Sequence, residues 1–107
     1  MRIVVSACLL CLVFAASAAA EDGQNPVERG RAIAQEFCSP CHAIGKADES
    51  PRQGAPPFRT LSKTLDLGEL PSRLRRGLTS GHPAMPSFKF NGRDARAMRD
   101  YLRTIQD

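Results

Sequence analysis

Two cysteines and a histidine form the most chemically specific stretch of this sequence, Cys38-Ser39-Pro40-Cys41-His42. Two thiols at this spacing can form thioether bonds to the two vinyl groups on one edge of a porphyrin. The histidine that follows can offer an imidazole nitrogen to the iron. The pattern Cys-x-x-Cys-His therefore predicts covalent attachment of one haem c through Cys38 and Cys41, with His42 as an axial ligand.

Three other roles for these residues fit the sequence less well. A disulfide between Cys38 and Cys41 would close a very short loop and would leave His42 unexplained. A zinc site would need two more ligands, but His82 is the only other histidine and the only other cysteines lie near the N-terminus. A thioredoxin-like redox pair would need a βαβ setting with a nucleophilic cysteine at a helix N-terminus, whereas this pair follows a predicted helix.

A second cysteine pair, Cys8 and Cys11, has the same spacing but no histidine after it. It lies in an apolar leader, in which one arginine precedes the apolar residues and small-x-small cleavage sites follow them. The apolar stretch is short for a membrane span. We therefore expect residues 1–20 to be a cleaved secretory signal peptide, with an uncleaved anchor as the alternative. Residues 21–107 would then form one domain in the periplasm, with no stable membrane insertion.

The remaining chain is short and basic. Residues 21–107 contain 14 Lys and Arg against 11 Asp and Glu, and eight of the basic residues fall between Arg73 and Arg103. A domain of this size is near the limit at which an apolar core alone suffices, so a covalently held haem would help to stabilise it. We expect no nucleic-acid partner, because an exported chain rarely meets nucleic acid and no aromatic residues are interleaved for base stacking.

Capping residues and apolar periodicity predict three helices. The first begins at Asn25-Pro26, where Asn25 is the cap, Pro26 suits the first helical position and Glu28 completes a capping box. The start of the second is uncertain because of Pro71, and the third follows a cap at Asn91. We expect the apolar stripes of all three to be buried; they are Val27, Gly30, Ala34 and Phe37, then Leu67, Leu70, Leu74 and Leu78, then Ala95, Met98, Leu102 and Ile105.

Met85 is the predicted second axial ligand. It lies in a loop punctuated by Pro83 and Pro86, which can present a side chain inward without helical constraints. A thioether is a soft ligand, and Met/His ligation raises the haem potential. Met98 falls on the apolar stripe of a helix, so we expect it to pack in the core. His82 is the rival ligand.

The mature chain as a whole resembles the class I cytochromes c, in particular the short bacterial type with one haem and His/Met ligation. The resemblance implies an all-α fold of three to four helices around one covalently bound haem, with the N- and C-terminal helices crossing. The chain departs from the family in having Ala55 where a glycine is common, and its segment between Phe58 and Met85 is much shorter than in mitochondrial relatives. The position of the haem motif near the mature N-terminus disfavours the four-helix cytochromes c′. The resemblance rests on Gly30, Cys38-x-x-Cys41-His42, Ala55-Pro56-Pro57-Phe58, Met85-Pro86 and Tyr101-Leu102.

The same resemblance implies roles for single residues. The carbonyl of Pro56 would accept a hydrogen bond from His42, with Pro57 as the near alternative, and Phe58 would also belong to the haem site. Gly30 would lie at the crossing of the first and last helices, with the ring of Tyr101 against it.

Two axial protein ligands would close the iron to substrates, which leaves outer-sphere transfer of one electron. We expect a soluble, monomeric electron carrier and not an enzyme. Its partners would be a donor dehydrogenase or membrane complex and an acceptor oxidase or reductase, approached by lysines that flank the haem loops. The alternatives are a dedicated haem subunit of a periplasmic dehydrogenase or sulfur-oxidising complex, and an open-site peroxidase or gas sensor using His82 with Arg75 or Arg76. The candidate docking lysines are Lys46, Lys63 and Lys89.

Overall fold

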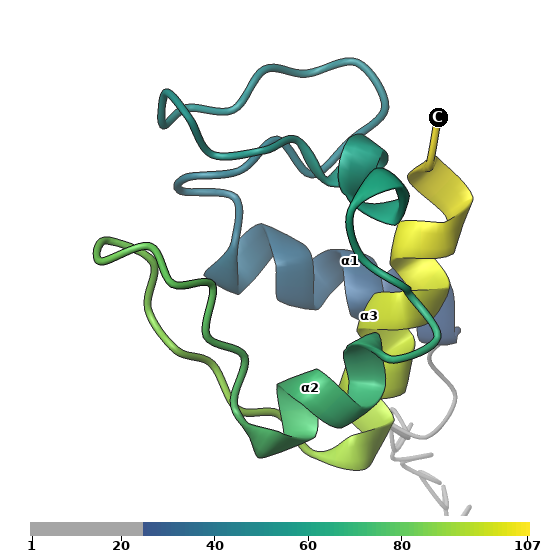
Figure 1. Cartoon of the computed structure of the whole chain (residues 1–107). Coiled ribbons are helices and arrows are strands. Elements are labelled where there is room, and N and C mark those ends of the chain that lie inside the picture. The colour runs from purple at the N-terminus through teal and green to yellow at the C-terminus, as the bar shows by residue number, and fades with distance from the viewer. Residues whose placement is uncertain (1–24) are drawn as a thin grey trace, which may run out of the picture.

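The computed structural model describes residues 25–107 (Figure 1). The predicted signal peptide, with Cys8 and Cys11, lies outside these residues. In the described part, no helix is long and apolar enough to cross a membrane, and the only β pairing is an isolated antiparallel bridge between Leu78 and Phe88. The predicted all-α fold class is therefore confirmed. The elements are α1 (Pro26–Phe37), the 3₁₀ helix η2 (Phe58–Lys63), α2 (Leu70–Arg76) and α3 (Gly92–Ile105).

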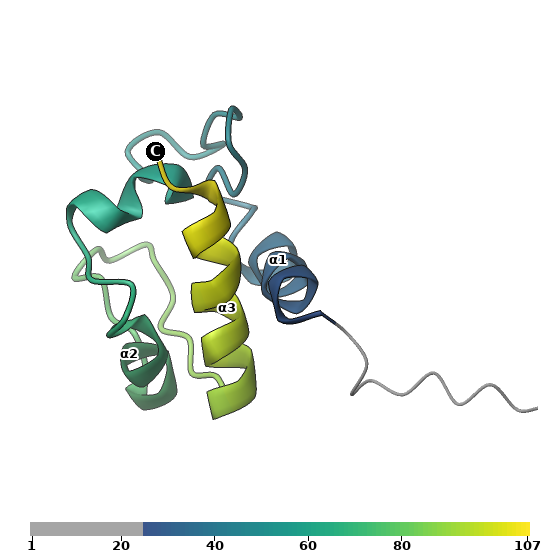
Figure 2. The same ribbon diagram turned by 90° about the vertical axis from the view of Figure 1, so that its right-hand side faces the viewer.

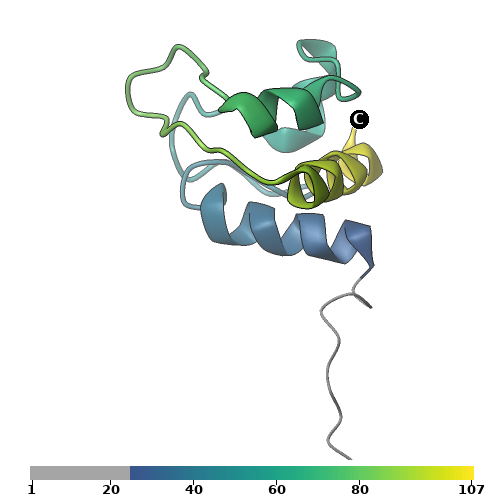
Figure 3. The ribbon, with the colours of Figure 1, turned by 90° about the horizontal axis from the view of Figure 1, so that it is seen from below.

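Helix α3 lies between α1 and α2, and it packs against both of them (Figures 2 and 3). In Figure 2, α1 is seen almost end-on while α3 runs down the view, so the first and last helices cross at a steep angle. This central position explains why α3 supplies much of the core. Its buried residues are Ala95, Ala97, Met98, Tyr101, Leu102 and Ile105.

Side-chain caps start both long helices at the predicted positions. The Asn91 side chain accepts a hydrogen bond from the backbone N–H of Asp94, at 2.8 Å. The Asn25 side chain accepts one from the N–H of Val27, at 2.9 Å. The cap of α1 therefore bonds to Val27, and the predicted capping box with Glu28 is not formed. In both helices the cap satisfies one of the N–H groups that the first turn leaves without a helical partner.

The two long helices cross at Gly30. A Cβ atom built on this glycine would lie 2.0 Å from the carbonyl oxygen of Ala97 and 2.7 Å from the Cβ of Tyr101. Only a residue without a side chain allows such an approach. The predicted crossing of the N- and C-terminal helices at Gly30 is confirmed, and Tyr101 lies against the glycine as expected. The contact is made by the backbone of Ala97 and the Cβ of Tyr101, and the Tyr101 hydroxyl donates to the carbonyl of Ile44.

An ion pair reinforces this crossing. Nε and Nη2 of Arg29 donate to the two carboxylate oxygens of Asp94, at 2.9 and 3.1 Å. Such fork-to-fork pairs fix geometry as well as charge. The pair joins the first turns of α1 and α3. The other acidic residue of α3, Asp100, pairs with its neighbour Arg99 at 3.0 Å.

Two expectations about apolar stripes were wrong. Phe37 is 41% exposed, because α1 continues past its crossing with α3 and its last turn projects beyond that helix (Figure 1). The second helix is also shorter than its leucine stripe. It ends at Arg76 because Gly77 adopts φ 98°, a conformation that does not continue a right-handed helix. Leu78 consequently lies in the bridge to Phe88.

Candidate functional site

The Cys-x-x-Cys-His motif forms a turn at the C-terminal end of α1. The N–H groups of Cys38 and Ser39 both donate to the carbonyl of Ala34, at 2.9 Å each. The N–H groups of Cys41 and His42 then donate to the carbonyl of Cys38, at 3.1 and 2.9 Å. Both cysteines are free thiols, and each is half-buried. The turn therefore presents two half-buried thiols and one imidazole from a single compact piece of backbone.

The His42 ring is held through one of its two nitrogens. Its Nδ1 lies 2.8 Å from the carbonyl oxygen of Pro56, which is the hydrogen bond that the family resemblance implied. Because a carbonyl oxygen only accepts, Nδ1 is the donor, and in the neutral ring the proton is then missing from Nε2. Among the described residues Nε2 has no hydrogen-bond partner. A histidine with one nitrogen bonded to a carbonyl and the other left free has the arrangement typical of a metal ligand.

Phe58 supports the His42 ring from the side. The two ring centroids are 4.9 Å apart, with the planes tilted by 34°, and Phe58 is only 7% exposed. Its backbone is fixed at both ends, because its N–H donates to Ala43 at 2.9 Å and its carbonyl accepts from Gln106 at 2.8 Å. Gln106 also accepts from the N–H of Ser62 at 2.9 Å. The C-terminus thus secures η2, and with it the Phe58 side chain.

Polar side chains shape the loop between His42 and Pro56. Asp48 accepts hydrogen bonds from the N–H groups of Ile44, at 3.2 Å, and Gly45, at 2.9 Å. Arg59 reaches back from η2 and donates to the carbonyl of Asp48, at 2.7 Å. The roles of Arg59, Asp48 and Gln106 could not be predicted from the sequence, because nothing in a single charged or amide residue indicates which distant backbone group it will bond.

The raised pKa of Cys38 argues against a redox-active cysteine pair. Burial raises the pKa of the Cys38 thiol to about 11, so this residue is a neutral thiol at physiological pH. Reactive cysteines of thioredoxin-like sites have lowered pKa values. Zinc is also disfavoured, because residues 25–107 contain no cluster of three His, Cys, Asp or Glu side chains that could hold a metal ion.

Met85 belongs to a different segment, the loop formed by residues 79–87. It is half-buried, and its N–H donates to the carbonyl of His82 at 3.1 Å. The ends of the loop are joined by the Leu78–Phe88 bridge. The loop and the segment after α1 project at the same end of the molecule (Figures 1 and 3). Met98, by contrast, is 3% exposed in the core, as expected for a packing residue.

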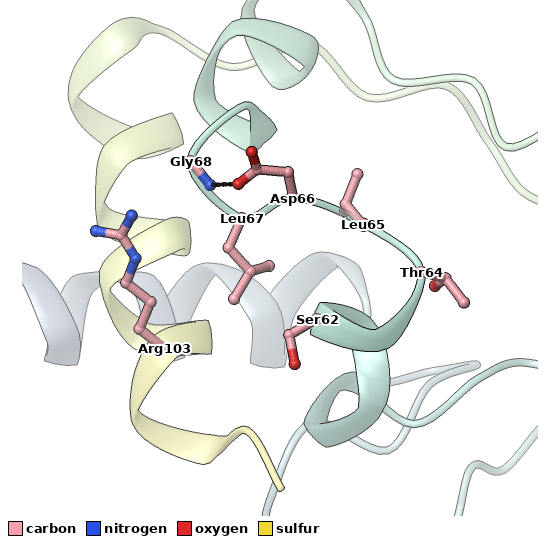
Figure 4. Close-up of a pocket in the computed structure, with 7 residues that line it drawn as sticks. All are labelled: Ser62, Thr64, Leu65, Asp66, Leu67, Gly68 and Arg103. Atoms are coloured by element: carbon pink, nitrogen blue, oxygen red, sulfur yellow. Dashed lines mark hydrogen bonds between the residues drawn. The ribbon is translucent and has the colours of Figure 1, made fainter.

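A surface hollow lies on another part of the molecule, between the η2–α2 connection and the C-terminal half of α3 (Figure 4). Its polar groups include Asp66, which accepts a hydrogen bond from the N–H of Gly68 at 2.8 Å, and Arg103. It contains none of the residues predicted to bind haem. The residues that line it are Ser62, Thr64, Leu65, Asp66, Leu67, Gly68 and Arg103.

The model of one protein family, described as cytochrome c oxidase, cbb3-type, subunit III, matches residues 25–102. The chain belongs to this family. It is a class I c-type cytochrome, and such domains bind haem and carry electrons. The matched segment includes the Cys-x-x-Cys-His turn and Met85. Neither the curated proteins nor the solved structures contain a significant match to this cytochrome.

The donor set at the turn fits a covalently held haem. Cys38 and Cys41 are both free to form thioethers. His42 keeps Nε2 free for iron while Pro56 fixes the orientation of the ring. Each of these groups therefore has the chemistry that attachment and axial ligation require.

Proposed function

We propose that this cytochrome is a periplasmic one-electron carrier with one haem c. The haem would be attached through Cys38 and Cys41, with His42 and Met85 as axial ligands. The observation that supports this most strongly is the hydrogen bond between Nδ1 of His42 and the Pro56 carbonyl, at 2.8 Å. It leaves the other nitrogen free within a turn that also presents two free thiols.

When bound, the haem supplies a centre that gains and loses one electron reversibly. The protein residues set how easily this happens. The Pro56 carbonyl orients His42 and raises the basicity of its ligating nitrogen. Phe58 packs against the imidazole and helps to exclude water. A Met85 thioether would favour the reduced state and so raise the potential.

A closed iron distinguishes a carrier from an enzyme or a gas sensor. An open-site peroxidase would need His82 to act with Arg75 or Arg76. In residues 25–107, no hydrogen bond joins His82 to either arginine; Nδ1 of His82 instead accepts from the N–H of Ala84, at 3.2 Å. Arg75 lies beside Gly92 at the start of α3. These placements favour the carrier.

The proposal includes export of the chain. Haem attachment of this kind takes place outside the cytoplasm, which is where the apolar leader of residues 1–20 would direct the protein. We propose that the mature domain, residues 21–107, works as a soluble monomer in the periplasm. It would pass electrons from a donor dehydrogenase or membrane complex to an acceptor oxidase or reductase.

Carbon monoxide binding to the reduced protein tests this function. The wild-type protein should resist carbon monoxide because both axial positions are filled. Met85→Ala should admit it and lower the potential, whereas the matched variant Met98→Leu, in the core, should leave the spectrum nearly unchanged. Rapid carbon monoxide binding by the wild-type protein would contradict the carrier and favour an open-site haem protein. A larger spectral change in Met98→Leu would reverse the ligand assignment.

A second candidate is a haem subunit fixed within a larger enzyme, such as a periplasmic dehydrogenase or a sulfur-oxidising complex. The description of the matching family, an oxidase subunit, is the observation that favours a fixed subunit. Size-exclusion chromatography of a periplasmic extract prepared without dissociating protein complexes distinguishes the free carrier from the fixed subunit. A free carrier should elute at the size of one domain, and a fixed subunit with its enzyme.

A further inference from the structure

Three phenylalanines from two distant parts of the chain meet at the end of α1. The ring of Phe37 lies edge-on to those of Phe88 and Phe90, with centroid distances of 6.0 and 5.5 Å and interplanar angles of 60° and 69°. Phe88 and Phe90 are stacked at 6.1 Å. Edge-on pairs at such distances are favourable because the positive ring edge faces the negative ring face.

Burial in the core does not explain the position of Phe37. Its side chain is 41% exposed. Phe37 lines a groove whose other walls include Phe88, Lys89 and Phe90. Phe37 contacts the rings of Phe88 and Phe90. Because burial does not account for the position of Phe37, this aromatic contact is the feature to be explained.

The contact joins the two segments that are proposed to hold the iron. Phe37 is the residue immediately before Cys38, and Phe88 is the third residue after Met85. The backbone of Phe88 is also fixed, because its carbonyl accepts from the N–H of Leu78 at 3.1 Å. Leu78 and Phe88 form the base of the loop. Of these two residues, Phe88 is the nearer to Met85 in sequence.

Within residues 25–107, no other hydrogen bond attaches the loop that carries Met85 to the rest of the domain. The hydrogen bonds of residues 79–87 stay within the loop: His82 bonds Ser80 at 3.1 Å, Ala84 bonds His82 at 3.2 Å and Met85 bonds His82 at 3.1 Å. The position of the loop relative to the haem motif therefore depends on its base. A short loop moves as its base moves, so a contact at the base can control where the Met85 sulfur lies.

We propose that the Phe37–Phe88 contact is a clamp that positions Met85 for the iron, an inference that rests on the proposed ligation by Met85. Neither phenylalanine is a ligand; both are positioning residues. The clamp holds the base of the distal loop against the residue that precedes the proximal cysteines. It sets the fraction of molecules in which the Met85 sulfur is in place, and hence how readily an added ligand replaces it.

Imidazole binding to the oxidised holoprotein measures this fraction, because imidazole competes with Met85 for the iron. The loss of the methionine-to-iron charge-transfer band reports the exchange. Phe37→Leu and Phe88→Leu keep an apolar side chain but remove the aromatic edge contact. Each should tighten the apparent imidazole affinity roughly tenfold, since more molecules would have Met85 displaced. The double variant should show less than the sum of the two single effects, because each single variant already removes the contact between Phe37 and Phe88.

Two controls separate positioning from general destabilisation. Val27→Ala removes apolar packing near the other end of α1, so it should lower the denaturation midpoint while leaving imidazole affinity at the wild-type value. Phe88→Tyr retains an aromatic edge and should behave like the wild type even if Phe88→Leu yields little holoprotein.

The outcomes also distinguish this inference from the proposed function. If both leucine variants bind imidazole as the wild type does and only their denaturation midpoints fall, the contact merely stabilises the fold and the clamp is wrong. If Met85→Ala has the oxidised spectrum of the wild type, Met85 is not a ligand, and the proposed ligation and the clamp fail together.

Discussion

A single hydrogen bond determines which nitrogen of His42 is available to a metal. The Pro56 carbonyl accepts a hydrogen bond from the N–H at Nδ1, so in the neutral ring the lone pair of Nε2 remains free. The bond also restrains rotation of the ring, which Phe58 limits from one side. The sequence places His42 next to two thiols, and the structure adds the acceptor that would orient it.

Tyr101 is a second residue whose hydroxyl carries a specific structural role. Its side chain is 6% exposed, and its hydroxyl donates to the backbone carbonyl of Ile44. Tyr101→Phe should lower the free energy of unfolding by about 1–3 kcal/mol, because a buried carbonyl would lose its donor. Denaturant unfolding at neutral pH, followed by far-ultraviolet circular dichroism, measures the change. A free energy equal to that of the wild type would mean that water replaces the hydroxyl.

The raised pKa of Tyr101 should make the stability of the protein fall at alkaline pH. Burial raises the pKa of Tyr101 in the folded protein, and the carboxylates of Asp48 and Glu28 raise it further, while Arg31 lowers it. A raised folded-state pKa means that the contribution is complete below the unfolded-state pKa of about 10 and is lost as pH rises through the folded value. Wild-type stability should therefore decline above about pH 10. Tyr101→Phe should show a shallower decline, and an equal decline would assign the effect to other groups.

Among the helices, the crossing of α1 and α3 tolerates the least change. The nearest neighbour of an added Cβ at Gly30 is the backbone oxygen of Ala97, at 2.0 Å, and a backbone atom cannot rotate away as a side chain can. Gly30→Val should overpack the crossing and cost about 1–3 kcal/mol, or more if the helices separate. A denaturant melt of the holoprotein, followed at the haem band, measures this cost.

Ala32→Val is the matched control, because Ala32 is exposed on the same helix. It should cost only about 0.5 kcal/mol, the difference in helix propensity. Haem should remain attached in both variants, since attachment depends on Cys38 and Cys41. Equal midpoints for the two variants would show that Gly30 tolerates a side chain and that the crossing lies elsewhere.

Capping residues in the sequence predicted where the two long helices begin. The features that the sequence did not predict, η2 and the exposure of Phe37, depend on contacts between elements. The caps at Asn25 and Asn91 act on neighbouring residues, so a short stretch of sequence is enough to identify them. The 3₁₀ helix η2 has no such signal, because it depends on Phe58 packing beside His42 and on Gln106 reaching back from the C-terminus. The exposure of Phe37 depends on where α3 crosses α1, which periodicity alone does not give.

In the candidate site, too, residues that are neighbours in sequence could be predicted, whereas contacts between distant segments could not. Neighbours in sequence indicated Cys38, Cys41 and His42, and the family resemblance added Pro56, whose carbonyl is in contact with His42. Met85 comes from a separate loop, so its ligation stays a prediction. The aromatic contact between Phe37 and Phe88 could not be predicted from spacing, because the two residues are far apart in sequence and belong to different elements.

On the scale of the whole molecule, the basic surplus should affect encounters with redox partners. The candidate docking residues Lys46, Lys63 and Lys89 are all exposed. Complementary charge mainly accelerates encounter, and salt screens it over roughly 8–10 Å. Electron-transfer rates with an acidic partner should therefore fall as ionic strength rises, and Lys89→Glu should weaken that dependence. Stopped-flow kinetics at several salt concentrations would reveal an apolar docking face if the rates did not change with salt.

Covalent attachment of haem is the central claim, because the carrier chemistry and both axial ligands depend on it. Intact-mass spectrometry of the exported protein after acid–acetone extraction tests it most directly. We predict a species with the mass of residues 21–107 plus one haem, and loss of that haem when Cys38 and Cys41 are both replaced by alanine. A wild-type chain with the mass of the bare polypeptide, with its haem recovered in the acetone, would contradict the claim.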